Sequence, residues 1–234
     1  AFLRGMDFDI WAFQECEVRP DLGDVHQETL AATNVPQKNI VTASRWPLFD
    51  RLDAPGGNAF ACIVDATTPF VFGNLWSFND RTHPEARACS YYNWYSCAIR
   101  MVDFCIKFAD DYGLPLVVAG DFNASLAHPG ATKLAKTHLA QTIGRWEDRG
   151  LVSAYHTHMR DQLSGDNLAL QLKREDFGNE TQQTVFGRSK GGWQYHIDYI
   201  FADRSFVRPI VVQTFDQMLS DHAPVIATFE ASLR

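Results

Sequence analysis

The chain has 234 residues, of which 46% are hydrophobic and 21% are charged, a composition typical of one globular domain. It excludes a disordered chain, and since no run of 18 apolar residues occurs, the sequence contains no membrane-spanning helix. With 21 basic and 28 acidic residues the net charge is −7, which argues against coating nucleic acid or an anionic membrane. A phosphate-handling enzyme stays compatible with this charge because a bound divalent metal supplies positive charge locally.

The five cysteines are an odd number and form no C-x-x-C pair, which favours reduced thiols and a cytoplasmic location. No internal repeat or linker divides the chain, so we expect a single domain over residues 1–234. Because Ala1 is not a methionine and residues 2–3 already read as the end of a helix, we expect that the domain's first strand is missing from the N-terminus.

The first half of the chain predicts strands followed by a long helix. Apolar runs predict strands at residues 9–15, 39–43, 58–65 and 69–76. Residues 85–112 carry apolar side chains at spacings of three and four, which predicts a helix. That helix should stop at Gly113 and Pro115. A further strand is expected at residues 116–119.

The second half predicts a helix over residues 132–149, a strand at 151–155 and then a long polar excursion with little core over 156–182. Strands return at 184–186, 195–202, 207–212 and 223–230. About ten strands and two long helices indicate a mixed α+β class rather than regular β-α-β alternation.

Four short polar clusters lie within or at the ends of these apolar strands. A carboxylate there costs desolvation energy unless it is paired or bound to a metal. One such cluster is explained by turn chemistry, but four that combine carboxylates with Asn, Gln or His are not. They are Gln14-Glu15, Gly120-Asp121-Phe122-Asn123, His196-Ile197-Asp198-Tyr199 and Ser220-Asp221-His222.

Strand alternation indicates which of these side chains share a face. Asp121 and Asn123 are two residues apart and project to the same side of an extended chain. Asp198 shares its strand face with His196 and falls in mid-strand, where a carboxylate needs a partner. A histidine is the natural partner, and His222 is a candidate.

In this order and separation, the clusters resemble the motifs of the endonuclease/exonuclease/phosphatase superfamily, the deoxyribonuclease-I-like fold. The resemblance covers residues 9–230 and includes a turn that reads Ser44-Arg45-x-Pro47. It implies a four-layer α/β sandwich, with two packed, mostly antiparallel sheets flanked by helices. It also implies hydrolysis of a phosphate ester with Mg²⁺ or Mn²⁺.

The residues suit that chemistry, because a cation must neutralise the anionic ester while water attacks in line. Glu15 would be a metal ligand and Asp221 a further one, directly or through water. Asp121 would orient or deprotonate the attacking water. Asn123 would hold that geometry, while His222, aligned and kept charged by Asp198, would donate to a phosphoryl oxygen.

Two positions depart from the family pattern. No strand carrying Trp-Asn precedes Ala1, and where many members carry His or Tyr this chain reads Asn74-Leu75-Trp76. Asn74 and Trp76 are therefore candidate substrate-binding residues. With Trp76 at this position the hydrogen bond to the phosphate is altered, because an indole can only donate. Arg188 and Lys190, in a loop near the expected site, are candidate phosphate contacts.

The leading hypothesis is a Mg²⁺-dependent nuclease that cleaves phosphodiester bonds in nucleic acid. A second hypothesis is a phosphatase or phosphodiesterase acting on a small phosphorylated molecule or a lipid headgroup, which the acidic net charge favours. A third is a catalytically silent binding module of the same fold. The retained acidic and histidine set argues against this last reading.

Overall fold

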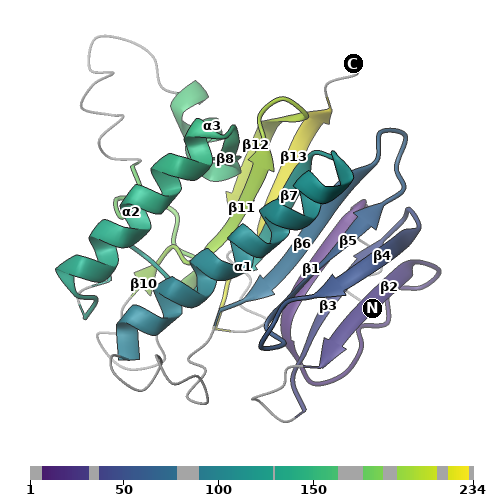
Figure 1. The fold of residues 1–234 in the computed structure, drawn as a ribbon, viewed down its shortest axis with the longest axis horizontal. Helices are drawn as coiled ribbons and strands as arrows, with labels where there is room; N and C mark the ends of the chain where they lie inside the picture. Colours follow the sequence, from purple (N-terminus) through teal and green to yellow (C-terminus); the bar gives the residue numbers. More distant parts are fainter. Residues whose placement is uncertain are drawn as a thin grey trace.

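The computed structural model describes residues 7–31, 37–77, 90–128, 130–162, 176–186, 194–214 and 221–231. Over these ranges the chain forms 13 strands and three helices. Figure 1 shows two long helices lying across one face of a large sheet, with further strands behind it. The expected α+β sandwich is confirmed.

The large sheet is mixed, and its central parallel pair explains where the long helix runs. β6 and β7 are parallel, so the chain needs a crossover between them. Helix α1 (Ser90–Tyr112) lies within that crossover and packs on the sheet. The strand order is β4 (Leu48–Asp53), β5 (Ala59–Val64), β6 (Phe70–Trp76), β7 (Leu116–Asp121), β11 (Asp198–Asp203) and β8 (Leu151–Ser153).

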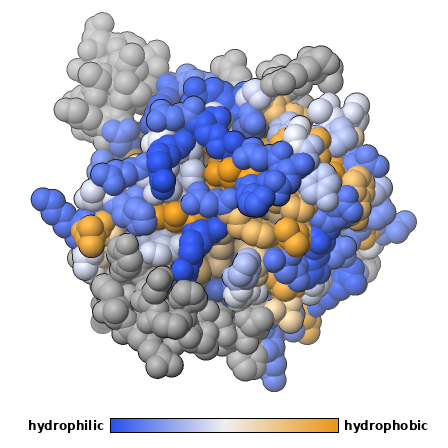
Figure 2. Space-filling model, in the orientation of Figure 1, coloured by the Kyte–Doolittle hydropathy of each residue, from blue (hydrophilic) through white to orange (hydrophobic). Residues whose placement is uncertain are grey.

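Alternation along these strands separates two hydrophobic cores. In β5, Ala61 and Ile63 pack under α1 and α2 (Lys133–Asp148), whereas Phe60 and Cys62 face the other strands of the sandwich. Both faces of the sheet are buried, which explains why β5, β6 and β7 read as continuous apolar runs. The outward face of the helices is mostly polar in Figure 2, with apolar groups showing between them.

The second layer consists of two smaller groups of strands. One is a three-stranded antiparallel sheet of order β1 (Ile10–Cys16), β3 (Asn39–Ser44) and β2 (His26–Ala31). The other is the hairpin of β12 (Val207–Thr214) and β13 (Val225–Ala231). A β-bulge between Phe13 and Cys16 bends the end of β1.

The predicted polar excursion after residue 155 is wrong in its first part. Helix α3 (Ala154–Gln162) begins where the strand was expected to continue. The Ser153 hydroxyl accepts a hydrogen bond from the backbone N–H of His156, as an N-cap does. Tyr155 and His156 are almost completely buried, so this segment belongs to the core.

Two other differences concern strands. The edge strands β2 and β4 were not predicted, because mostly polar side chains hide their alternation. The expected strand at 195–202 is divided into β10 (Gln194–Tyr195), which pairs with β9 (Val185–Phe186), and β11.

No helix in the described ranges is long and apolar enough to cross a bilayer. Among the described residues no disulfide joins the cysteines, which are Cys16, Cys62, Cys97 and Cys105.

Candidate active site

The site forms where β7, β11 and the segment 221–223 meet. Asp198 is the register partner of Asp121 across the antiparallel pair. Their neighbours Ala119 and Ile200 pack in the core between the layers, so both carboxylates project to that face. Two motifs that are 77 residues apart in the sequence thus bring two carboxylates side by side.

The turn after β7 holds Asp121 in place. The backbone N–H of Asn123 donates to Asp121 Oδ1 at 2.8 Å, and its side-chain amide donates to Oδ2 at 2.7 Å. The same amide donates to the Ser77 carbonyl at 2.6 Å. Asn123 has a φ of 47°, a left-handed conformation that Asn tolerates better than most residues. Asp121 and Asn123 therefore come together as expected, but they do so in a turn rather than along an extended strand.

Gly120 is required by close packing at the same turn. Its φ is 149°, and a Cβ at this position would lie 1.9 Å from the carbonyl oxygen of Leu75. Any side chain here would push β7 away from β6 and displace Asp121.

Asp198 and His222 form the expected pair. His222 Nδ1 lies 3.0 Å from Asp198 Oδ2 and 3.2 Å from Oδ1. Burial alone would lower the pKa of His222, but the hydrogen bond to Asp198 and the charges of Asp198, Asp121 and Asp221 raise it to about 9. The imidazole is therefore an imidazolium at neutral pH.

Around Asp121 the surroundings disfavour the charged form of the side chain, whereas around His222 they favour it. It is 3% exposed, and burial, followed by the charge of Asp198, raises its pKa well above the ordinary value. The charges of His222 and the hydrogen bond from Asn123 oppose this rise, while Glu15 adds to it. A buried carboxyl with a raised pKa beside a cationic histidine is a pairing common in acid–base sites.

Glu15 lies at the bulged end of β1, exposed and with a φ of 56°. The preceding residue ties this end to the large sheet, because Gln14 Nε2 donates to Asn74 Oδ1 at 2.7 Å. The Asn74 amide in turn donates to the Val41 carbonyl at 3.0 Å and to Thr42 Oγ1 at 3.1 Å. Asn74 thus connects the two layers directly behind Glu15.

The candidate substrate residues lie in different surroundings. Asn74 is completely buried and its amide is engaged by protein groups, so in this structure it supports the site from within. Trp76 is 4% exposed and packs in the core between the layers, although it is the register partner of Asp121. Arg188 and Lys190 lie outside the described residues, as does Ser220.

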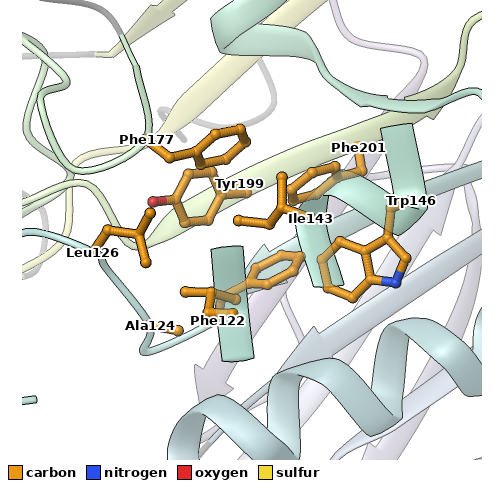
Figure 3. Close-up of a pocket in the computed structure, with 9 residues that line it drawn as sticks. Phe122, Ala124, Leu126, Ile143, Trp146, Phe177, Tyr199 and Phe201 are labelled. Atoms are coloured by element: carbon orange, nitrogen blue, oxygen red, sulfur yellow. The ribbon is translucent and has the colours of Figure 1, made fainter. Parts of the chain in front are cut away.

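An aromatic cluster lies on the other face of the same strands. Phe122 and Tyr199 follow Asp121 and Asp198 in the sequence, and their rings meet edge to face at 5.4 Å. They line a small apolar pocket with Phe177, Phe201 and Trp146. Figure 3 shows these rings gathered around the pocket. Each carboxylate is therefore followed in sequence by a ring packed on the opposite side of the sheet.

The described residues contain one group with the spacing of metal ligands. Ligand atoms of Asp121, Asp198 and His222 lie within 4.8 Å of one another. In this group the Nδ1 atom of His222 is engaged by Asp198, and the raised pKa of His222 favours the protonated ring, with which a metal would have to compete. The crowded carboxylates, with the charge of Glu15 acting on Asp121, suit a hard divalent cation, which would relieve their repulsion.

Sequence reasoning does not single out Thr184, which lies between the two site segments. Its hydroxyl accepts hydrogen bonds from the backbone N–H groups of Ile197 and Asp198. A threonine at a strand end is common, so its residue type gives no signal. Only the division of the expected strand at 195–202 reveals that these N–H groups need another acceptor.

Solved structures share this architecture at low sequence identity. The APE2 catalytic domain from Xenopus laevis superposes with a TM-score of 0.64 at 15% identity, over 98% of this chain and 86% of that one. A Neisseria 3′ phosphatase, NExo, bound to a product DNA hairpin gives 0.61 at 17% identity, over 98% and 91%. A mannosyl-6-phosphatase from Bacteroides thetaiotaomicron gives 0.53 at 16% identity, over 95% and 85%.

No curated protein sequence matches the chain significantly. The model of the Endonuclease/Exonuclease/phosphatase family, in contrast, matches residues 1–222. This match spans all four polar clusters and agrees with the fold and with the arrangement of Asp121, Asp198 and His222. The chain belongs to the Endonuclease/Exonuclease/phosphatase family.

Proposed function

We propose that the protein is a divalent-metal-dependent phosphoesterase, and specifically a nuclease that hydrolyses phosphodiester bonds. The observation that carries the proposal is the pairing of Asp198 with an imidazolium His222 directly beside the buried Asp121. Water attack on a phosphate diester needs a group that handles the water's proton and a donor for the phosphoryl oxygens. This arrangement supplies both.

In the proposed reaction Asp121 orients the attacking water or accepts a proton from it. Asn123 fixes the carboxylate of Asp121 through its two hydrogen bonds. His222 donates from Nε2 to a phosphoryl oxygen while Asp198 holds Nδ1 and keeps the ring charged.

Mg²⁺ or Mn²⁺ is the metal proposed, with Glu15 as a ligand and Asp221 as a further ligand, directly or through water. The metal supplies charge neutralisation of the phosphate when bound. The carboxylate-rich donor set around Asp121 fits a hard cation, because the charges of Asp198 and Glu15 both disfavour the ionised form of Asp121.

A second candidate function is a phosphatase or phosphodiesterase acting on a small phosphorylated or lipid substrate. The net charge of −7 favours it, because a long polyanion would be repelled by most of the surface. The fold likeness to a mannosyl-6-phosphatase adds support.

The test is hydrolysis of a substrate panel with Mg²⁺ or Mn²⁺, containing plasmid DNA, single-stranded RNA, inositol phosphates, a sugar 6-phosphate and sphingomyelin. Asp121→Ala should reduce the rate by about 10²- to 10⁴-fold. Asp203→Asn, on the same strand as Asp198 and bonded locally to Ser205, is the matched control and should retain it.

Cleavage of DNA or RNA that depends on Asp121 would support the nuclease. Hydrolysis of a small substrate alone would contradict the nuclease and support the second candidate function, a phosphatase or phosphodiesterase. No turnover of any substrate, together with no binding of Mg²⁺ or Mn²⁺ in calorimetry, would support the catalytically silent module.

A further inference from the structure

We propose that Thr184 is a positioning residue that sets the Asp198–His222 geometry for phosphoester hydrolysis, an inference that rests on the proposed function. Thr184 is completely buried and touches neither the Asp198 carboxylate nor the His222 ring by any described hydrogen bond. It lies just before β9, between the start of β11 and the segment 221–223.

The Thr184 side chain holds the Asp198 half of the pair. Its Oγ1 accepts from the backbone N–H of Ile197 at 2.9 Å and from that of Asp198 at 3.1 Å. These two N–H groups lie between the end of β10 and the first residue of β11, where the hydrogen bonds of the β-sheet do not provide them with an acceptor. Buried N–H groups must be paired, and here a single hydroxyl oxygen pairs both.

The Thr184 backbone holds the His222 half. The Thr184 carbonyl accepts from the N–H of Ala223 at 2.7 Å. Next along the chain, Val185 forms an antiparallel bridge with His222, and the Phe186 N–H donates to the Asp221 carbonyl at 2.9 Å.

One residue therefore bonds to the backbone on each side of the contact between Asp198 and His222. Loss of the hydroxyl would leave the N–H groups of Ile197 and Asp198 without this acceptor, so the start of β11 could shift even though it stays paired with β7, while the segment 221–223 stays bonded. The contact of 3.0 Å tolerates little displacement, and a shift of about 1 Å at a reacting group costs about 100-fold in rate.

The experiment compares Thr184→Val, Thr184→Ala and Thr184→Ser with Thr142→Val in the full chain. Thr142 is also completely buried, but it lies on α2 and bonds to Arg145. It controls for the general cost of removing a buried hydroxyl. The first readout is kcat and KM for whichever panel substrate the wild-type protein hydrolyses.

The second readout needs no substrate. In metal-free protein, the proton shared between His222 Nδ1 and Asp198 should give a downfield ¹H resonance, assigned by its loss in His222→Gln. This signal reports the pair directly, so the positioning role can be judged even if no substrate is turned over, which would contradict only the proposed function.

Thr184→Val and Thr184→Ala should lower kcat by about 10- to 100-fold with KM nearly unchanged, and should abolish the downfield signal. Thr184→Ser keeps the acceptor and should retain both kcat and the signal, as should Thr142→Val. If Thr184→Val does not fold, the Ala and Ser variants decide, because they differ only in the hydroxyl. A folded Thr184→Ala with wild-type kcat and an intact signal would overturn the proposal, as would equal losses in Thr142→Val.

Discussion

Replacing Asp198 by Asn should remove most of the pH dependence that His222 gives to the stability of the metal-free protein. Asn keeps the shape of the side chain but removes its charge and its second acceptor oxygen. The hydrogen bond and charge of Asp198 are the leading causes that raise the pKa of His222 to about 9 against the opposing effect of burial. In the variant burial prevails, and the pKa of His222 should fall.

The magnitude follows from linkage. A folded-state pKa raised from 6.5 to about 9 corresponds to roughly 3 kcal/mol of stability. Because the folded pKa lies above the unfolded one, this contribution is complete below about pH 6.5 and is lost as the pH rises through about 9. The wild-type protein should therefore lose roughly 3 kcal/mol between about pH 6 and pH 9.5 that the variant does not lose.

The assay is urea unfolding in EDTA at both pH values, which gives the free energy of unfolding by linear extrapolation. Asp198→Asn also relieves the raised pKa of Asp121, which changes the pH dependence in the same direction, so a second variant is needed to assign the effect to the histidine. His222→Gln should show the same flattening, whereas Asp203→Asn should show the wild-type loss. An equal loss in the wild type and in Asp198→Asn would refute this account of His222.

Two further substitutions test how the site is supported. Gly120→Ala should prevent stable folding, since its Cβ would lie 1.9 Å from the Leu75 carbonyl oxygen, and a normally folded variant would contradict this close approach. The control is Gly144→Ala, on α2 with open space around it, which should raise the thermal midpoint slightly. Asn74→Ala should destabilise the protein by about 1–3 kcal/mol because it leaves buried partners unsatisfied. It should also weaken Mg²⁺ binding in calorimetry by releasing Gln14 beside Glu15, and unchanged binding would show that this end of β1 is fixed by other contacts.

The sequence predicts the strongly patterned elements well and the edge elements poorly. Both faces of β5 and β6 are buried, so their apolar runs identify them without any structure. β2 and β4 are edge strands with mostly polar or exposed side chains, and their pairing depends on neighbours rather than on local pattern. Helix α3 was not predicted because its N-cap, Ser153, ends an apolar run that also fits a strand.

The site divides in the same way. Alternation and the need of a mid-strand carboxylate for a partner made His222 a candidate for Asp198, and the family resemblance implied the pair that the structure contains. The register that places Asp198 opposite Asp121 is a property of the assembled sheet, and so are the altered pKa values that follow from it. Asn74 shows most clearly what the sequence does not reveal. Its place in the motif suggested a substrate contact, but its side chain hydrogen-bonds to Gln14 and Val41 and so connects the two sheets.

The distribution of the site along the chain has a consequence for protein synthesis. Glu15 emerges from the ribosome early, but His222 emerges some 200 residues later and belongs to a segment bonded to Thr184. A growing chain that ends before residue 222 can form the β4–β7 part of the large sheet, whose strands are close in sequence, but it lacks the imidazolium. Nascent chains and truncated products that lack residue 222 would thus be without the proposed phosphoryl-oxygen donor, and on that proposal hydrolytic activity would appear only after this segment has joined the site.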